Sequence, residues 1–378
     1  VVLTADRPAE LHYCGAPQTI DQHGLFGRFA RAALQLGTPD AAPLSLRGCR
    51  LTVAHAVGLA MGPIPGPVQL NIPLRKPLEP AAPHTEEERD FVSFSDNIAD
   101  ATPIVSHATV QATVPAHVTE LIATAQRGII AVGNVPAYDR DLAAAVAELA
   151  RATGFVVIAE SGSQLRLAGR CISHHDALVS CAARGVLAPD LIVQIGGELA
   201  SSGWIAARVA WASATTVMLD RFAQHDPHSQ AAAIIVGELA TTVRALTVPS
   251  TAASLQPRAA YAATWNALDA VASASVETAL AANSTAEPGF VKAAVRSLPK
   301  GAGLLLGNSL PIRVVDQVCD PSDDNERWVV TQRGANGIDG LLAGAAGAVA
   351  ARGPAMLLIG DVSFSHDVGS LAVLRTCN

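Results

Sequence analysis

The sequence predicts an α/β protein of two or three doubly wound domains with parallel sheets. Three observations predict this fold class. The length of 378 residues exceeds one ordinary domain. Short apolar runs alternate with segments of helical spacing. Several runs end directly in Gly, Asn or Asp, as buried parallel strands do where they open into loops.

Composition excludes several classes of protein. Hydrophobic residues make up 50% of the chain and charged residues 16%, which supports sizeable cores. A net charge of −7 with scattered Lys and Arg argues against a nucleic-acid surface. No apolar run is long enough to span a membrane and no signal peptide opens the chain. The cysteines show no CxxC pair and no zinc spacing, so we expect free thiols in a cytoplasmic protein; they are Cys14, Cys49, Cys171, Cys181, Cys319 and Cys377.

Residues 1–80 form the first block. Val1–Ala5 is predicted as a buried strand, Leu25–Leu36 as a helix and Gly66–Pro73 as a further strand. Residues 81–114 are expected to form a solvated linker, because prolines and an acidic run replace the apolar pattern there.

Residues 115–285 alternate strand and helix signals and predict a doubly wound central domain. The expected strands are 128–132, 155–159, 191–195, 215–219 and 232–236, and the expected helices 139–152, 205–212 and 257–282. Gly133-Asn134 and Gly196-Gly197 follow strands and are candidates for touching a ligand. No GxGxxG follows the first strand, so a dinucleotide site is not expected.

Residues 286–378 repeat the pattern, with helices over Glu287–Leu298 and 341–351 and strands over Gly303–Leu306 and Ala355–Ile359. The last strand is expected to be buried and to end at Gly360-Asp361. Ligands bind at that edge of open α/β sheets. An Asp there, followed by Ser363 and backbone N–H groups, suits a Mg²⁺ ion that carries a phosphorylated ligand. A turn capped by Asp361 is the plainer alternative.

These motifs together resemble one family, the 2-succinyl-5-enolpyruvyl-6-hydroxy-3-cyclohexene-1-carboxylate (SEPHCHC) synthases, which are thiamine diphosphate enzymes of menaquinone biosynthesis. The resemblance runs through nearly the whole chain and is weakest in the middle. The matching phrases are TADRPAEL (4–11), CGAPQTIDQ (14–22), GPVQLNIPL (66–74), GNSLPIR (307–313), RGANGIDG (333–340) and IGDVSFSHD (359–367).

The resemblance implies three doubly wound parallel-sheet domains, the first and last incomplete. Residues 1–80 would be the C-terminal part of a pyrimidine-binding domain. Residues 115–285 would be a structural central domain, and residues 286–378 the N-terminal part of a diphosphate-binding domain.

The resemblance also implies a cofactor site for thiamine diphosphate with Mg²⁺ or Mn²⁺. Asp361 is a metal ligand in this scheme, with Ser309, Gly360 and Ser363 near the diphosphate. Ile338 is the apolar wedge under the cofactor, and its plainer alternative is a core residue at a helix start.

Three arginines match family positions that bind substrate carboxylates, namely Arg7, Arg313 and Arg333, each expected just after a strand. Planar guanidinium groups suit carboxylates because they bind them bidentately. A single Arg at a strand end is usually a surface residue, but three in matched motifs favour the substrate role. Gln18 joins Ile338 in the catalytic group because it matches a position close to cofactor and substrate.

The implied activity is that of a transferase. It decarboxylates 2-oxoglutarate and adds the resulting succinyl carbanion equivalent to isochorismate, giving SEPHCHC and CO₂. The implied assembly is a homodimer or homotetramer, since sites of this superfamily form between subunits. No nucleic acid and no membrane is expected as a partner.

Departures from the family pattern also matter. We expect the chain to be cut at both ends, because the activating Glu would precede the first strand and the Asn that completes the metal motif would follow Asn378. Pro17 stands where the family often carries Asn, and the loop 197–203 lacks the lysine of some members.

Other readings stay open or are disfavoured. Another thiamine diphosphate carboligase, of the acetolactate synthase kind, remains an alternative that the three arginines argue against. A non-catalytic homologue would follow if the chain ends are natural. His174-His175 is a poor metal pair because adjacent helical residues point about 100° apart. Neither Ser309 nor Ser363 lies in a GxSxG elbow, which disfavours a hydrolase.

Overall fold

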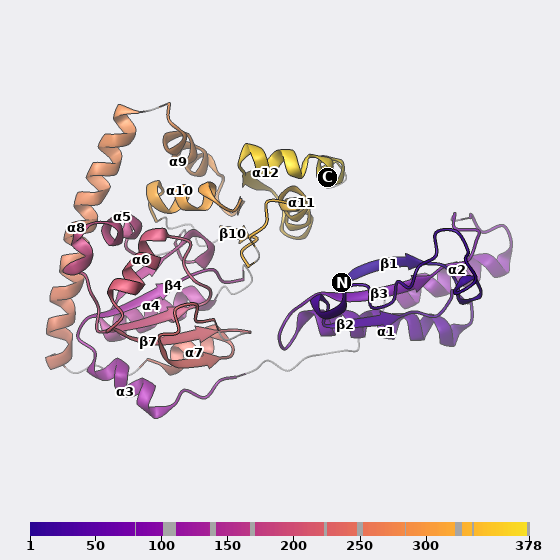
Figure 1. Cartoon of the computed structure of the whole chain (residues 1–378), viewed down its shortest axis with the longest axis horizontal. Helices are drawn as coiled ribbons and strands as arrows, with labels where there is room; N and C mark the ends of the chain where they lie inside the picture. The colour runs from indigo at the N-terminus through magenta and orange to yellow at the C-terminus, as the bar shows by residue number, and fades with distance from the viewer. Residues whose placement is uncertain are drawn as a thin grey trace. The chain divides into compact units, whose positions relative to one another are not determined.

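Three parallel sheets carry the fold of the described residues, which confirms the α/β class (Figure 1). The computed structural model describes residues 1–79, 81–100, 111–136, 141–166, 171–222, 225–247, 252–283, 285–321, 327–334 and 336–375. The chain divides into two units, Val1–Val110 and Gln111–Asn378. The further division of the second unit at residue 285 stays a prediction.

The first unit is a three-stranded sheet in the order β1-β3-β2, with β1 (Val2–Asp6), β3 (Val68–Pro73) and β2 (Ala32–Gln35) all parallel. Helix α1 (Pro43–Met61) packs against β3, and α2 (Glu86–Ala99) packs against α1 (Figure 1). The central strand β3 is almost entirely buried, and the two edge strands are not.

Two sequence predictions are wrong in this unit. The helix expected over Leu25–Leu36 is a 3-10 turn followed by strand β2. Gly24 and Gly27 take positive φ values of 76° and 49°, which interrupt any helix, and pairing with β3 then sets the extended conformation. Strand β1 is not buried, since Leu3 is 64% exposed at the sheet edge.

The stretch expected as a linker contains helix α2. Its first turn is closed by a capping box, in which the Thr85 hydroxyl accepts the Glu88 N–H at 3.1 Å and the Glu88 carboxylate accepts the Thr85 N–H at 3.1 Å. The acidic run therefore starts a helix at its favourable end. Residues 101–110 of this stretch lie outside the described residues, as does Pro80 just before it.

The central sheet has the order β5-β4-β6-β7-β8 and is parallel throughout. Its strands are β4 (Gly128–Val132), β5 (Val156–Ala159), β6 (Leu191–Ile195), β7 (Thr215–Asp220) and β8 (Ala231–Val236), within a residue of the predicted bounds.

Two separate hydrophobic clusters cover the two faces of this sheet, so it is doubly wound as predicted. One face carries α3 (Ala116–Thr124), α4 (Asp141–Thr153) and α7 (Leu239–Ala245). The other carries α5 (His175–Ser180), α6 (Ser202–Ala210) and α8 (Ala252–Ala282). Figure 1 shows α8 running along the side of the sheet toward the last part of the chain.

The last sheet has the order β10-β9-β11, with β9 (Gly303–Leu306) in the centre, β10 (Trp328–Thr331) and β11 (Ala355–Leu358). Strand β11 was predicted to be buried but is half-buried, because it lies at an edge of the described sheet. The helices are α9 (Glu287–Ser297), α10 (Leu310–Val318), α11 (Leu341–Arg352), α12 (Asp361–His366) and α13 (Leu371–Leu374).

A buried ion pair joins the central sheet to helix α10. Arg166 is 0% and Asp316 2% exposed, and Arg166 Nε lies 3.5 Å from Asp316 Oδ1. Arg166 Nη2 also donates to the carbonyl oxygens of Ser173, Asp316 and Cys319 at 2.6, 2.7 and 2.8 Å. The N–H and hydroxyl of Ser161 donate to Asp316 Oδ1 at 2.7 and 2.5 Å. Burial raises the pKa of Asp316, and the Arg166 charge and the Ser161 bonds oppose that rise.

Side-chain amides extend this contact. Gln164 bonds both backbone groups of Val329 in β10, accepting its N–H at 3.0 Å and donating to its carbonyl at 2.8 Å. Gln317 Nε2 in α10 donates to Asp176 Oδ2 at 2.9 Å. The last sheet and the central domain are therefore joined along both α10 and β10.

The cysteines that the structure describes are free thiols, and Cys377 lies outside the described residues. No helix in the described part of the chain combines the length and apolarity needed to cross a lipid bilayer.

Replacing Asp316 by Ala should lower the free energy of unfolding by about 3 kcal/mol, because it leaves the Arg166 charge buried without its partner. Urea unfolding followed by circular dichroism measures the loss. Gln317→Ala is the control, since it removes a single exposed hydrogen bond of about 1 kcal/mol from the same helix. Equal losses in the two variants would contradict a structural role for the ion pair.

Candidate active site

The carboxyl ends of β9, β10 and β11 meet at one edge of the last sheet, and each continues into a motif that the sequence singled out. The Gly307 N–H donates to the Leu358 carbonyl at 2.8 Å. A Cβ on Gly307 would lie 3.1 Å from that oxygen and 3.3 Å from Ile359 Cα, so the loop after β9 lies directly against the end of β11. The fold thus brings three motifs together.

Asn308 ties two of these loops to each other. Its side chain is 5% exposed, and Nδ2 donates to the carbonyl oxygens of Gln332 and Gly337 at 3.3 and 2.8 Å. The buried Oδ1 has no hydrogen-bond partner among the described residues. Sequence analysis quoted Asn308 within a motif but assigned it no role. Its unpartnered oxygen is an acceptor held at the candidate site.

Ser309 has a strained backbone, with φ 71° and ψ −120° immediately before α10. A non-glycine residue in such a conformation costs about 1–3 kcal/mol and persists only where the surroundings impose it. The strained residue is therefore one that the family resemblance places near the diphosphate.

Asp361 is the exposed first residue of α12, and no group in the described parts of the chain hydrogen-bonds its carboxylate. Ser363 is 8% exposed on the same helix, and no heavy atom lies within 4 Å of the position where Gly360 would carry a Cβ. No group of three or more His, Cys, Asp or Glu side chains in the described residues forms a ready cation site. A single free carboxylate after β11, at the sheet edge where Asn308 keeps an unpartnered amide oxygen after β9, fits a Mg²⁺ ion that takes its other ligands from phosphates and water.

The two arginines of the second unit that were predicted to bind substrate both have N–H groups without a hydrogen-bond acceptor among the described residues. Arg313 was expected just after a strand but lies within α10. Its Nε donates to the Ala200 carbonyl at 3.1 Å and its Nη1 to the Ser309 carbonyl at 2.7 Å, while no described acceptor takes the Nη2 hydrogens. Arg333 is half-buried two residues after β10, and its guanidinium has no hydrogen-bond acceptor in the described ranges. Both can bind an external anion.

A buried carboxyl group that the sequence analysis missed is linked to Arg313 through the backbone of Ala200 and interacts electrostatically with Arg333. Glu160 follows β5, is 1% exposed, and accepts the Ala200 N–H at 2.7 Å through Oε2, while Oε1 has no described partner. Burial raises the pKa of Glu160 to about 8, and the Asp316 carboxylate adds to the rise while Arg333 opposes it. The sequence signal that could have identified Glu160 was an acidic residue directly after the predicted strand 155–159.

Ile338 lies in the loop that precedes α11, half-buried and outside the buried core clusters. Because α11 begins only at Leu341, the alternative of a core residue at a helix start has no support.

In the first unit, Arg7 and Gln18 are brought together although eleven residues separate them. Arg7 Nη2 donates to Gln18 Oε1 at 2.8 Å, and the Arg7 N–H donates to Asp6 Oδ1 at 2.8 Å. Gln18 has φ 60°, in the left-handed region. Arg7 directly follows β1, as expected.

Doubly wound sheets commonly bind ligands in the crevice beyond the carboxyl ends of their strands. At the carboxyl ends of β4 and β6, the protein's own backbone occupies this position. The Gly133 N–H donates to the Ile195 carbonyl and the Gly197 N–H to the Asn134 carbonyl, both at 3.0 Å. A Cβ on Gly133 would overlap the Gly197 carbonyl oxygen. These glycines therefore serve close packing between two loops.

His174 and His175 are buried at the start of α5. Burial lowers the pKa of His175 to about 3, so its ring is neutral, and His174 Nδ1 lies 3.7 Å from Asp269. The third residue of that motif, Asp176, is engaged by the Ser201 hydroxyl and by Gln317.

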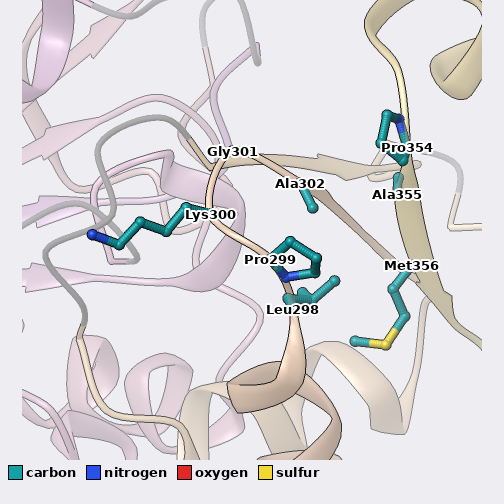
Figure 2. Close-up of a pocket in the computed structure, with 8 residues that line it drawn as sticks. All are labelled: Leu298, Pro299, Lys300, Gly301, Ala302, Pro354, Ala355 and Met356. Carbon is teal, nitrogen blue, oxygen red and sulfur yellow. The ribbon is translucent and has the colours of Figure 1, made fainter.

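A cavity of about 320 Å³ lies at the opposite edge of the last sheet, where β9 and β11 begin (Figure 2). Its lining is Leu298, Pro299, Lys300, Gly301, Ala302, Pro354, Ala355 and Met356. Figure 2 shows the Lys300 side chain extending away from Met356. This cavity is separate from the three motifs.

The proteins of similar sequence described below carry the same name. No protein-family model matches the sequence. Proteins named 2-succinyl-5-enolpyruvyl-6-hydroxy-3-cyclohexene-1-carboxylate synthase are similar over 98–99% of the chain. The identity is 37% for Sorangium cellulosum, 36% for Myxococcus xanthus and 35% for Geobacillus thermodenitrificans. The chain spans only 62%, 63% and 63% of the lengths of these relatives, respectively.

A crystal structure described as a candidate thiamin diphosphate-dependent enzyme from Mycobacterium smegmatis has a similar fold, with a TM-score of 0.54 and 14% identity. The similarity covers 98% of this chain and 68% of that one.

The raised pKa of Glu160 predicts a specific pH dependence of stability. Between its ordinary pKa of 4.5 and about 8, Glu160 is protonated only in the folded state, so stability falls as pH rises. Relative to Glu160→Gln, the wild type should lose up to about 1.4 kcal/mol per pH unit in this window and level off above it. Urea unfolding at a series of pH values measures the difference. A constant difference from pH 5 to 9 would contradict burial of the protonated acid.

Proposed function

The chain belongs to the SEPHCHC synthase family, and on this premise we propose that it is part of a transferase acting on 2-oxoglutarate and isochorismate. The proposed reaction removes CO₂ from 2-oxoglutarate and adds the remaining four-carbon unit to isochorismate, in menaquinone biosynthesis. The observation that carries the proposal is the convergence of three family motifs at one sheet edge, with two arginines that keep free donors there.

The proposed cofactor is thiamine diphosphate with Mg²⁺ or Mn²⁺, which supplies the electron sink for loss of CO₂. Asp361 would bind the metal ion, with Ser309, Gly360 and Ser363 near the diphosphate. The free carboxylate of Asp361 and the strain at Ser309 support this assignment. Ile338, half-buried in its loop, would support the cofactor as an apolar wedge.

The proposed substrates carry several carboxylates, and Arg313 and Arg333 would bind them. Arg313 is already oriented by two carbonyl oxygens, so binding fixes few additional rotamers. The protein has a net charge of −7, so anion binding depends on locally placed guanidinium groups rather than on a general field. Arg7 and Gln18 are proposed for the same reaction from the family motif, and their mutual hydrogen bond is compatible with a shared site.

We also propose a homodimer or homotetramer, because active sites of this superfamily form between subunits. Mass photometry of the protein as its source cell makes it measures the assembly directly.

The activity test uses the protein as its source cell makes it, with thiamine diphosphate and Mg²⁺. CO₂ release and a new adduct that require both 2-oxoglutarate and isochorismate would support the proposal. Turnover of pyruvate without isochorismate would favour a carboligase of the acetolactate synthase kind. Absence of turnover together with absence of thiamine diphosphate binding would favour a non-catalytic homologue.

Asp361→Ala should abolish Mg²⁺-dependent retention of thiamine diphosphate, because it removes the proposed metal ligand. Equilibrium dialysis with and without Mg²⁺ measures retention apart from activity. Asp141→Ala is the matched control, since Asp141 is likewise an exposed acid in the first turn of a helix, α4, and lies outside the three motifs. Unchanged retention in Asp361→Ala would exclude the metal role.

Arg333→Ala should raise KM for the substrate that its guanidinium binds by about 10- to 100-fold, the loss expected for one charge-assisted contact. Thiamine diphosphate binding should stay within a factor of two. Steady-state kinetics with each substrate varied in turn measures the change, and Arg151→Ala on the surface of α4 is the control. Equal kinetics of Arg333→Ala and wild type would refute the carboxylate-binding role.

A further inference from the structure

We propose that Glu160 is a positioning residue that holds Arg313 in its substrate-binding orientation through the backbone of Ala200. The inference rests on the proposed function, because it takes Arg313 as a substrate-binding residue. Glu160 is only 1% exposed, so we place it as a group that acts through another residue.

The contact chain is short and continuous. Glu160 Oε2 accepts the Ala200 N–H at 2.7 Å, and the Ala200 carbonyl accepts Arg313 Nε–H at 3.1 Å. Ala200 itself is 2% exposed and packs in the same hydrophobic cluster as Ile312 and Val315 of α10. Moving Ala200 therefore moves the acceptor that orients the guanidinium.

In the loop after β6, the Glu160 side chain holds the Ala200 N–H and the Arg313 side chain meets the Ala200 carbonyl. The loop is held at its start by the bond from Gly197 to Asn134, and at its end by the Ser201 hydroxyl on Asp176. Without Glu160, the buried Ala200 N–H would lose its acceptor, which is costly in a buried site.

The chemistry of Glu160 suits this role. Groups on three elements face it: Asp316 on α10, Glu198 after β6 and Arg333 after β10. Burial keeps the carboxyl protonated at neutral pH, so it accepts the Ala200 N–H without setting a negative charge near Arg333. A charged carboxylate there would compete with substrate carboxylates for the Arg333 guanidinium.

A double-mutant cycle tests the inference in the protein as its source cell makes it, loaded with thiamine diphosphate and Mg²⁺. The variants are Glu160→Ala, Arg313→Ala and the two together. One readout is kcat/KM for both substrates. A second, independent of turnover, is the dissociation constant of glutarate, a dicarboxylate that lacks the reactive 2-oxo group, measured by calorimetry.

Glu160→Ala should weaken glutarate binding and lower kcat/KM by about tenfold in the wild-type background, but by less than about twofold when Arg313 is already Ala. Glu160→Gln should stay within about twofold of wild type, because its amide oxygen still accepts the Ala200 N–H. Multiplicative effects in the double mutant, or equal damage by Gln and Ala, would overturn the inference.

Two controls separate this result from other failures. Glu238→Ala removes a carboxylate that likewise accepts backbone N–H groups, those of Ala240 and Thr241, and should leave glutarate binding unchanged. If Glu160→Ala does not fold, Glu160→Asp, which withdraws the carboxyl by one methylene, replaces it in the cycle. A wild type without turnover or glutarate binding would contradict the proposed function itself, whereas an active wild type with independent effects would contradict only the role of Glu160.

Discussion

The buried pair of Arg166 and Asp316 is the contact on which the second unit depends. Two charges removed from water are stable together only when their remaining hydrogen-bonding groups are also satisfied. Here four carbonyl oxygens accept from the two terminal nitrogens of Arg166, and Ser161 donates twice to Asp316. Arg313 lies three residues before Asp316 on α10, so the pair that fixes the helix also fixes the start of the arginine side chain.

The candidate site is therefore divided between parts with different tasks. The last sheet supplies the loops that carry the family motifs. Residues that follow β5 of the central sheet supply hydrogen bonds that position the neighbouring elements. Glu160, Gln164 and Arg166 follow one strand, β5, and contact or hold the loop after β6, strand β10 and helix α10. The loops after β4 and β6 pack against each other through backbone at the carboxyl ends of the central sheet.

Sequence patterns predicted most strands of the second unit because those strands are continuous apolar runs, which are typical of parallel strands in a covered sheet. They failed over Leu25–Leu36, where apolar residues compatible with a helix are paired into a sheet instead. Motif positions such as Ser309, Arg333 and Asp361 could be proposed from the sequence because each motif is local in the chain, and their roles stay predictions. Arg166 and Asp316 were missed because 150 residues separate them, and nothing in either neighbourhood indicates the other. Asn308 was quoted within a motif, but only the packing of two loops reveals that its side-chain oxygen has no hydrogen-bond partner among the described residues.

The amide of Gln164 has a consequence for how the last sheet behaves in solution. Strand β10 forms one edge of the described sheet, and an open edge is a template on which another chain can add a strand. Gln164 engages both the N–H and the carbonyl of Val329, as a neighbouring strand would. The central domain thereby blunts this edge with a side chain, which protects the protein against edge-to-edge aggregation without adding a further strand.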